Sequence, residues 1–582
     1  MLMCGIAGYI GKKKASELLL KSIKNLEYRG YDSIGMATVS EGEIRMKKGK
    51  GKVSEVDSSM NFSSLSGSMG IAHTRWATHG EPSEKNAHPH LSTSGKIAIV
   101  HNGIIENYLE LKEEMKDCEY KSETDSEVVA HLLEKNYSGN LKDAVLKTIN
   151  QLHGTYAICA IRPDTNEIVV ARNGSPLAIG IGEEENFIGS DVSAFVEHTR
   201  KVIYLDDFQI ASIKENSIEI YDGKSNPVSL ETKTINWDVE KAQKQGYKHF
   251  MLKEIHEQPQ IVRDSLSIPI EPNLEDNPRK IFIVACGTAG YAGLTGKYIF
   301  EKYTRIPVEV VYASEFRYSN PVIGQKDLFI SISQSGETAD TLAALRLAKQ
   351  KGAKTLGIIN VAESTIARES DAVIYTRAGP EIGVASTKAF ISQLVVLYKL
   401  AEKLSGIQID LSKIPEKIET ILLQEENIRE IAKKYFKVYN FLYIGRNFNF
   451  PIALEGALKL KEISYIHAEG YASGEMKHGP IALVCDEVPT VAIAPKDSIY
   501  PKVVSNMQEI KARNGNILAV ATEGDESIKA HATDILYIPE TKEELYPLLS
   551  VVPLQLLAYH IADLRDCDID KPRNLAKSVT VE

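Results

Sequence analysis

The sequence predicts a multidomain protein in which a layered α+β domain is followed by two copies of an α/β unit with a parallel sheet. The 582 residues are too many for one hydrophobic core, so three or four domains are expected. Strand patterns and helix patterns form separate groups as far as residue 238, which is typical of a layered α+β domain. From residue 280 onward short apolar runs alternate with helical patterns, and this alternation occurs twice.

The elements of the first domain follow from hydrophobic periodicity. Apolar runs bounded by turn residues predict buried strands, and apolar residues at helical spacing predict amphipathic helices. The expected strands are 4–10, 96–103 and 155–161, and the expected helices are 15–30, 126–137 and 141–152.

Changes in composition predict the domain boundaries. The polar, helix-prone stretch from residue 236 predicts a helical connector, which the Pro-rich acidic segment 267–278 ends. The expected division is a first domain over 4–238, a connector over 239–277, α/β units over 278–410 and 434–566, and an extended polar tail over 567–582.

Charge and cysteine content exclude several classes of function. The net charge of −10 and the lack of a Lys/Arg patch argue against a nucleic-acid partner. The six cysteines are scattered without metal-ligand spacing, so neither a structural metal nor a disulfide framework is expected. No apolar run approaches the roughly 20 residues of a membrane helix, and no signal peptide is recognisable. A soluble cytoplasmic protein is therefore expected.

Cys4, followed by Gly5 near the start of the chain, offers a chemistry that other cysteines lack. Once the residues before it are removed, its α-amino group has an ordinary pKa of about 7.7–8.0 and can act as the base for its own thiol. The alternative is a small buried hydrophobic residue at the start of a strand, as most free cysteines are.

Polar segments of the first domain fit a site for a free amino acid. An arginine beside Trp76 and His79 in the loop 73–80 suits a ligand carboxylate, and an acidic residue in 122–127 suits an ammonium group. The segment HNG at the end of the strand 96–103 offers oxyanion donors. With the thiol, Arg75, Asn102, Gly103 and Asp125 describe an amidase for an amino acid such as glutamine, although each alone is also an ordinary loop residue.

The segment SQSGET, residues 333–338, follows a strand and opens a helix. Ser333, Ser335 and Thr338 supply hydroxyl groups and Gly336 allows close approach of a ligand. A phosphate monoester is therefore expected at this helix N-terminus. A well-capped helix without a ligand is the alternative.

Four residues of the second α/β unit and the tail are open to two interpretations. Lys459 and Glu462 share a helix face and by default form a solvated ion pair. His478 lies in a Gly-bounded turn, where a lone histidine is usually a surface residue but has a pKa suited to proton transfer. Lys577 is by itself only a lysine in a tail.

In their order along the chain, the motifs resemble the family of isomerizing glutamine–fructose-6-phosphate aminotransferases. The resemblance spans essentially all 582 residues and rests on CGI, YRGYDS, HTRWATHG, NAHPH, HNGIIENY, ETDSE, SQSGETADT, EIGVASTKAF, LEGALKLKEISYIHAE, KHGP and PRNLAKSVTVE. It implies a four-layer α+β Ntn-hydrolase domain, which is a class II glutamine amidotransferase, joined to two α/β sugar isomerase (SIS) domains with parallel sheets. It also implies glutamine and fructose 6-phosphate as substrates, a homodimer, and no metal or organic cofactor.

For the glutamine half, the resemblance implies that Cys4 attacks the amide, forms a thioester and releases ammonia. Asn102 and Gly103 would stabilise the oxyanion. The other implied residues of the glutamine pocket are Arg75, Thr78, His79, His88 and Asp125, and Trp76 would gate an internal ammonia channel.

For the sugar half, the resemblance implies that Lys577 forms a Schiff base and that Glu462 moves a proton between C1 and C2. His478 of a second copy would open the sugar ring. The implied sugar-phosphate-binding residues are Thr288, Ser333, Gln334, Ser335, Thr338, Val384, Ser386, Lys459 and Ala576.

The chain departs from the family pattern at two places. Ala289 stands where the family usually has serine, which predicts weaker sugar binding or a compensating water. Met1 and Leu2 precede Met3, and with residues 1–3 attached the nitrogen of Cys4 is an amide. Translation from Met3 and removal of that methionine are therefore expected.

Three other functions share parts of this pattern. Another class II amidotransferase, one that makes phosphoribosylamine, would need a phosphoribosyltransferase half, which the duplicated unit argues against. A sugar-phosphate-sensing regulator built on SIS domains would need a DNA-binding helix and would not need Cys4. A SIS deaminase would have no reason to keep the glutaminase half.

Overall fold

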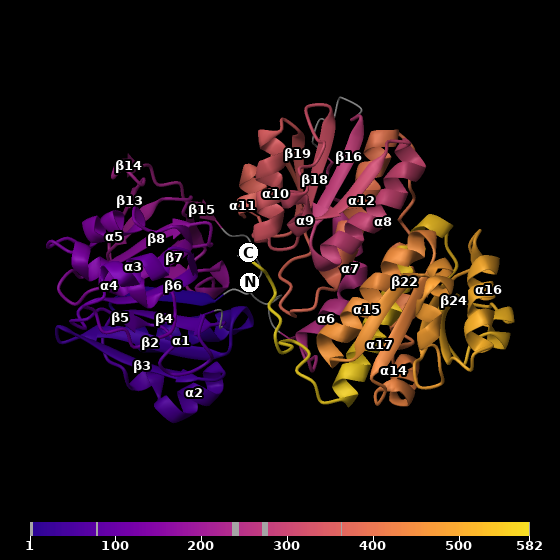
Figure 1. The fold of residues 1–582 in the computed structure, drawn as a ribbon, viewed down its shortest axis with the longest axis horizontal. Helices are drawn as coiled ribbons and strands as arrows, with labels where there is room; N and C mark the ends of the chain where they lie inside the picture. Colours follow the sequence, from indigo (N-terminus) through magenta and orange to yellow (C-terminus); the bar gives the residue numbers. More distant parts are fainter. Residues whose placement is uncertain (1–3, 77–78, 235–243, 271–277, 363, 581–582) are drawn as a thin grey trace. The chain divides into compact units, whose positions relative to one another are not determined.

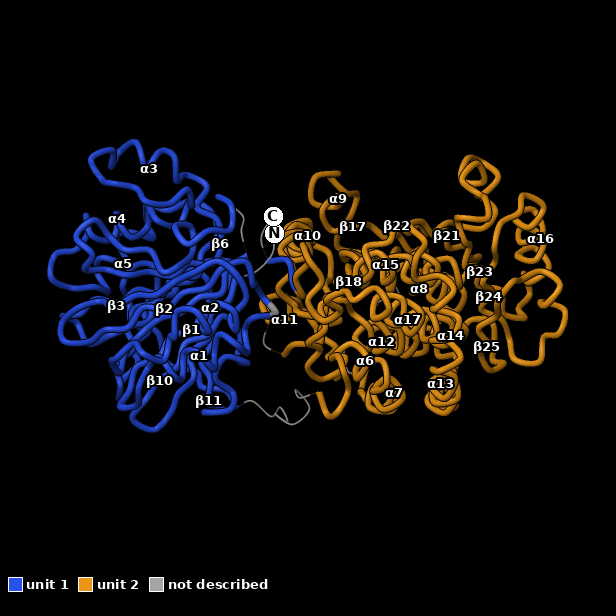
Figure 2. Tube along the Cα trace, turned by 90° about the horizontal axis from the view of Figure 1, so that it is seen from below, with its two compact units in different colours: residues 1–239, 578–582 blue, residues 240–577 orange. Residues whose placement is uncertain are grey.

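The computed structural model describes residues 4–76, 79–234, 244–270, 278–362 and 364–580. The chain forms two compact units, unit 1 with residues 1–239 and 578–582, and unit 2 with residues 240–577 (Figure 2). Thr78, one of the expected residues of the glutamine pocket, lies outside the described residues.

Unit 1 is built on two antiparallel sheets (Figure 1). The strand order of the first sheet is β15 (Lys233–Thr234), β11 (Lys201–Tyr204), β9 (Ala178–Ile181), β10 (Glu185–Gly189), β1 (Gly5–Gly11), β4 (Met69–Arg75), β2 (Ser33–Ser40) and β3 (Glu43–Lys50). The order of the second is β14 (Pro227–Val228), β13 (Ile218–Tyr221), β12 (Ile210–Ile213), β8 (Ile168–Asn173), β7 (Gly154–Ile161), β6 (Ala98–Ile105) and β5 (His90–Leu91). The site-bearing strands β1 and β4 are neighbours in the first sheet, and β6 lies near one edge of the second.

Apolar side chains arrange unit 1 in four layers. Ile6 and Ile71 of the first sheet share one core with Val100 and Val170 of the second, so the two sheets pack face to face. The outer layers are α1 (Ala15–Leu26) and α2 (Val53–Met60) on the first sheet, and α3 (Tyr108–Glu114), α4 (Glu127–Asn136) and α5 (Leu141–Ile149) on the second. This arrangement confirms the expected four-layer α+β fold, and β1, β6, β7, α1, α4 and α5 lie where periodicity predicted them, within a few residues.

Unit 2 contains the expected duplication. Its two parallel sheets have the same order, 2-1-3-4-5 within each repeat. The first sheet is β17 (Val308–Tyr312), β16 (Lys280–Ala285), β18 (Asp327–Ser333), β19 (Lys354–Ile359) and β20 (Ala372–Tyr375). The second is β22 (His467–Ala472), β21 (Asn440–Gly445), β23 (Thr490–Ala494), β24 (Ile517–Thr522) and β25 (Asp534–Ile538).

Helices cover both faces of each parallel sheet. The first repeat has α8 (Gly287–Thr304), α9 (Ala313–Tyr318), α10 (Ala339–Gln350), α11 (Thr365–Glu369) and α12 (Lys388–Ser405). The second has α15 (Phe450–Ser464), α16 (Tyr500–Lys511) and α17 (Tyr546–Leu564), and α13 (Ile414–Leu422) and α14 (Glu425–Tyr435) join the repeats. In the first repeat α8 and α10 belong to different cores, so they lie on opposite faces of the sheet. The direction in which the chain winds across the sheet therefore reverses between β16 and β18. Sheets of this kind bind ligands at such a reversal point.

The expected connector is helical, but it is part of the core of unit 2. α6 (Phe250–His256) and α7 (Gln258–Leu266) bury Met251, Ile255 and Val262 in the core that α12 and α17 also share. The Asp570 carboxylate caps α6 by accepting hydrogen bonds from the N–H groups of Phe250 and Met251 at 2.9 and 3.0 Å. The polar tail is thus tied to this segment. The two repeats lie in one compact unit, and the boundaries expected between them remain predictions.

α17 corrects the expectation that no apolar run reaches membrane-spanning length. Among the described residues, the segment Glu543–Leu564 is the one helix that is long and apolar enough by length and composition alone. Its most apolar window is wholly buried in unit 2, where α17 packs against α14 and α15. The run is apolar because α17 is a central core helix of the second repeat.

Candidate active sites

Cys4 lies just before β1 and contacts the residue that follows β4. Its Sγ accepts a hydrogen bond from the N–H of Trp76 at 3.2 Å. Its carbonyl oxygen accepts from the side-chain amide of Asn102 at 2.8 Å and from Arg29 Nε at 3.3 Å. Burial raises the pKa of the thiol to about 11. The thiol is therefore protonated near neutral pH and needs a base before it can attack a substrate.

Arg75 lies within electrostatic reach of both Cys4 and the oppositely charged Asp125. Arg75 ends β4 and donates from Nη2 to the carbonyl oxygen of His79, whereas its Nη1 is buried without a hydrogen-bond partner among the described residues. Asp125 is buried, accepts from the N–H of Ile105 at 2.8 Å and lies 3.9 Å from His79 Nδ1. A guanidinium with an unused donor and a buried carboxylate suit the carboxylate and ammonium groups of a free amino acid.

Gly103 follows Asn102 in β6 and has no room for a side chain. Its φ is +129°, and a Cβ atom there would lie 2.0 Å from the carbonyl oxygen of Thr155 on β7. A larger residue would push apart the strand pair that positions Asn102. The glycine is therefore required by the backbone, whatever else its N–H does.

Three buried histidines support Asn102 from behind. His73 Nε2 lies 3.0 Å from Asn102 Oδ1, the ring of His88 stacks on His73 at 4.2 Å, and the edge of His90 meets His88 at 4.4 Å. Burial lowers the pKa of His73 to about 3 and those of His88 and His90 well below the ordinary range, so all three rings are neutral. His88 thus supports the site through His73. The sequence alone predicted no role for His73, although its position in the motif HTRWATHG was a signal that could have indicated one.

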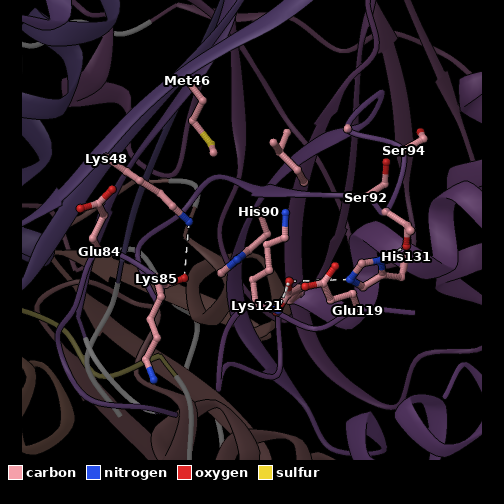
Figure 3. A pocket seen from close by; sticks show the side chains of 14 residues that line it. Met46, Lys48, Glu84, Lys85, His90, Ser92, Ser94, Glu119, Lys121 and His131 are labelled. Atoms are coloured by element: carbon pink, nitrogen blue, oxygen red, sulfur yellow. Dashed lines mark hydrogen bonds and ion pairs between the residues drawn. The ribbon is translucent and has the colours of Figure 1, made fainter. Parts of the chain in front are cut away.

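A separate cavity of about 620 Å³ lies in unit 1 at the outer end of this histidine stack (Figure 3). Its wall includes His90, Lys48, Lys121 and His131. None of the described residues expected in the glutamine pocket lines it. It is therefore distinct from the group of residues around Cys4.

In unit 2 the segment 333–338 forms a tight turn between β18 and α10. Ser333 Oγ accepts a hydrogen bond from the N–H of Gly336 at 2.9 Å and lies 3.1 Å from Thr338 Oγ1. Gly336 has φ +66°, and a Cβ atom there would lie 1.9 Å from Ser364 Oγ, so only glycine fits. Thr338 precedes α10 without making a side-chain cap, so the positive end of α10 faces the turn. The alternative of a well-capped helix is wrong.

The α15 residues Lys459, Glu462 and Glu455 meet Thr288 at the start of α8. Lys459 Nζ donates to Thr288 Oγ1 at 3.1 Å and forms ion pairs with Glu462 at 2.5 Å and Glu455 at 3.4 Å. The Lys459 side chain is only 1% exposed, so the default interpretation of a solvated pair is wrong. Burial raises the pKa of Glu455 to about 8, and the Glu462 carboxylate adds to this shift. Glu455 had no predicted role, although its spacing of four from Lys459 placed it on the same face.

Lys577 is buried against the loop that precedes α12. Its Nζ donates to the Glu381 carboxylate and, at 2.8 Å, to the carbonyl oxygen of Gly383. Ser386 Oγ donates to the same carboxylate at 2.9 Å. The Glu381 charge also contributes to the raised pKa of Lys459, so the two clusters are within electrostatic reach of each other. A free tail lysine, the alternative, is thus contradicted.

The remaining expected residues make few side-chain contacts that would indicate a role. Val384 is buried and its N–H donates to the carbonyl oxygen of Asp570 at 3.0 Å. Gln334 and Ser335 lie in the turn of 333–338, and Ala576 precedes Lys577. His478 is exposed at the end of the 3-10 helix η6 (Ser473–His478) and forms no hydrogen bond or ion pair within the part of the chain that the structure describes. A single chain therefore does not bring His478 to the Lys577 cluster.

Comparisons with known families match both units. Residues 73–197 match the family model of a glutamine amidotransferase domain. Residues 276–403 and 434–564 match the family model of the SIS domain, once in each repeat.

Curated relatives align with the chain over its full length. The glutamine–fructose-6-phosphate aminotransferases (isomerizing) of Aquifex aeolicus and Chlorobaculum tepidum are each 50% identical to this chain, with all of both chains covered. A solved structure of the C-terminal domain of glucosamine-fructose-6-phosphate aminotransferase from Francisella tularensis is 41% identical. It covers 56% of this chain and 99% of that chain, with a TM-score of 0.52.

Proposed function

Since the chain belongs to the family of isomerizing glutamine–fructose-6-phosphate aminotransferases, we propose that it converts glutamine and fructose 6-phosphate to glutamate and glucosamine 6-phosphate. The observation that carries this function is the identity of 50% over the full length of relatives with that activity in their names. The two sites described above supply groups for both half-reactions. A SIS-domain regulator and another class II amidotransferase are less well supported, because neither would match over the whole chain.

In unit 1, Cys4 attacks the glutamine amide and forms a thioester, and ammonia leaves. The buried Nη1 of Arg75 supports its role as the partner of the α-carboxylate, and Asp125 suits the α-ammonium. Asn102 and Gly103 stabilise the oxyanion, and His79 and Thr78 complete the pocket. Trp76 contacts Cys4 through its backbone, which supports a place for it at the exit taken by ammonia.

In unit 2, the turn 333–338 binds the phosphate of fructose 6-phosphate at the N-terminus of α10. Lys577 forms a Schiff base with the open-chain ketone, and Val384 and Ser386 contact the sugar. Glu462, held by Lys459 and Thr288, moves the proton between C1 and C2. The Glu381 carboxylate beside Lys577 supports this role, because it can accept the ammonium proton that a lysine must lose before it attacks.

We also propose a homodimer in which His478 of a second copy opens the sugar ring, and a cytoplasmic location. The exposure of His478 in a single chain supports the first proposal. The six free cysteines are compatible with the second, because a reducing compartment keeps thiols free.

The direct test is a product assay on purified, correctly processed protein. Glutamine with fructose 6-phosphate should give glutamate and glucosamine 6-phosphate in equal amounts. Glutamate without any amino sugar, under conditions where both substrates bind, would contradict the proposed function.

Replacement of Arg75 by lysine is expected to raise KM for glutamine by roughly ten- to a hundredfold, because one or two charged hydrogen bonds of about 1.5–3 kcal/mol each are lost. KM for fructose 6-phosphate should not change. Arg45→Lys, which alters an exposed ion pair with Glu41 in the same unit, is the matched control. An unchanged glutamine KM in the Arg75 variant would remove Arg75 from the pocket.

A further inference from the structure

Glu254, on α6, is a wholly buried carboxylate beside the Lys577 cluster. It is 1% exposed, and its Oε1 accepts hydrogen bonds from the N–H groups of Ile382 and, at 3.2 Å, Gly383. Its Oε2 is buried without a hydrogen-bond partner among the described residues. Gly383 also provides the carbonyl oxygen that accepts from Lys577 at 2.8 Å. Glu254 therefore holds, from behind, the backbone against which Lys577 lies.

A second buried carboxylate, Glu381, immediately precedes the 382–383 backbone that Glu254 contacts. It receives the Lys577 ammonium, the Ser386 hydroxyl at 2.9 Å, and the N–H groups of Thr387 and Ala389 at 2.9 Å each. When two buried carboxylates approach the same short stretch of backbone, ionisation of both is unfavourable because their negative charges repel each other. Glu381 has a cation and three further donors, whereas Glu254 has two backbone N–H groups only. The proton therefore resides on Glu254.

The surrounding charges agree with this assignment. Lys388, on α12, and Lys253, on α6, both pair with Glu257, at 2.7 and 3.2 Å. Burial, with the Glu381 charge, raises the pKa of Glu254 to about 8, although Lys577 and Lys388 oppose the shift. Lys577 lowers the pKa of Glu381. Near neutral pH the group is thus a neutral Glu254, an anionic Glu381 and a cationic Lys577.

We propose that Glu254 is a positioning residue of the Lys577 site, which holds the 382–383 backbone as a neutral carboxylic acid and keeps a second negative charge away from Lys577. This inference rests on the proposed Schiff-base function. In that step the Lys577 ammonium gives a proton to Glu381, and the free amine forms a C–N bond at C2 of the open-chain ketone. The amine's second proton moves to the C2 oxygen, and Glu381 returns the first proton to the same oxygen. Water then departs, and a protonated Schiff base remains.

Ionisation of Glu254 would oppose this step. A second carboxylate charge beside Lys577 stabilises its ammonium form over the free amine, so less free amine is available for attack. Through the range around pH 8 in which Glu254 ionises, the synthase activity of the wild-type protein should therefore gain less from a rise in pH than the free amine alone would give.

Glu254→Gln tests the inference, because glutamine keeps an acceptor for the two N–H groups and cannot ionise. Its synthase activity at about pH 7 should lie within about threefold of wild type, and at about pH 9 it should exceed wild type by about five- to tenfold, since one pKa unit is tenfold in free amine. Asp534→Asn, a buried carboxylate of the same unit that binds Tyr435 at 2.7 Å, is the matched control and should give the same ratio at both pH values. A Glu254→Gln ratio to wild type that stays constant from pH 7 to 9 would overturn the role of Glu254.

Trapping of the Schiff base covers the case in which Glu254→Gln does not fold. Wild-type protein with fructose 6-phosphate and cyanoborohydride should gain one sugar on Lys577, at a rate that rises less than tenfold per pH unit around pH 8. A trapping rate that keeps rising tenfold per pH unit would contradict the inference. Absence of any adduct on Lys577 would instead contradict the proposed Schiff-base function, so the two failures are distinguishable.

Discussion

Replacement of Lys577 by arginine is expected to reduce glucosamine 6-phosphate formation by about 10³-fold or more. Arginine retains a cation for the Glu381 carboxylate and the Gly383 carbonyl oxygen, so the tail keeps its anchor. Its guanidinium stays protonated and cannot attack a ketone, whereas the lysine amine can. The synthase rate, measured from the amino sugar formed, should therefore collapse while glutamine hydrolysis remains.

The control for this variant is Lys434→Arg, in which an exposed lysine that pairs with Asp534 is changed in the same way. It should leave both activities unchanged. Equal losses of glutaminase and synthase activity in the Lys577 variant would argue for a general structural role of Lys577, and retention of synthase activity would remove it from the chemistry.

Replacement of Cys4 by alanine is expected to abolish glutamine hydrolysis, with a loss of about 10⁴-fold. The other groups of the pocket stay in place, but no nucleophile remains to form the thioester. Isomerisation of fructose 6-phosphate, which uses unit 2 alone, should survive. Cys118→Ala, a change of another free cysteine in unit 1, should leave both activities intact. Residual glutaminase activity in the Cys4 variant above one-tenth of wild type would contradict the nucleophile.

The same chemistry makes a prediction about residues 1–3. The thiol of Cys4 has a raised pKa of about 11 and needs a base, and a peptide nitrogen cannot serve as one. Protein whose intact mass shows Cys4 as the first residue should hydrolyse glutamine, and protein that retains Met1 should not. Full glutaminase activity in the longer form would rule out the α-amino group as the base.

Much of the fold could be predicted from the sequence because local patterns specify it. The alternation of apolar runs with helices predicted both repeats of unit 2, and β1, β6 and β7 were recognisable from their apolar residues. The apolar length of α17 was underestimated, because a run buried on all sides carries no polar face to break it. Burial of α6 and α7 was also missed, although Met251 and Ile255 have helical spacing; the many polar residues around them hid that signal.

Some of the candidate site residues could be recognised from sequence motifs, whereas the surroundings of others depend on tertiary packing. Arg75, Asn102 and Asp125 were recognisable from the polar motifs that contain them, although only Arg75 ends a strand: Asn102 lies inside β6, which continues to Ile105, and Asp125 precedes α4. The burial of Lys459 could not be predicted from the sequence. Helical spacing shows which residues share a face, but it does not show what covers that face. Only the packing of α15 against α8 shows that Lys459 is buried beside Thr288. Glu254 gave no signal, and Glu381 was recognisable only as the first residue of the motif EIGVASTKAF, since the approach of the two carboxylates to the 382–383 backbone depends on the tertiary position of α6.

Transfer of the glutamine amide nitrogen to the sugar is the claim on which the whole account depends. The most direct measurement supplies glutamine labelled with ¹⁵N at the amide, fructose 6-phosphate and an excess of unlabelled ammonium, and determines the mass of the glucosamine 6-phosphate formed. The glucosamine 6-phosphate is expected to carry ¹⁵N. Product with unlabelled nitrogen would contradict transfer between the two sites, and absence of the amino sugar would contradict the function itself.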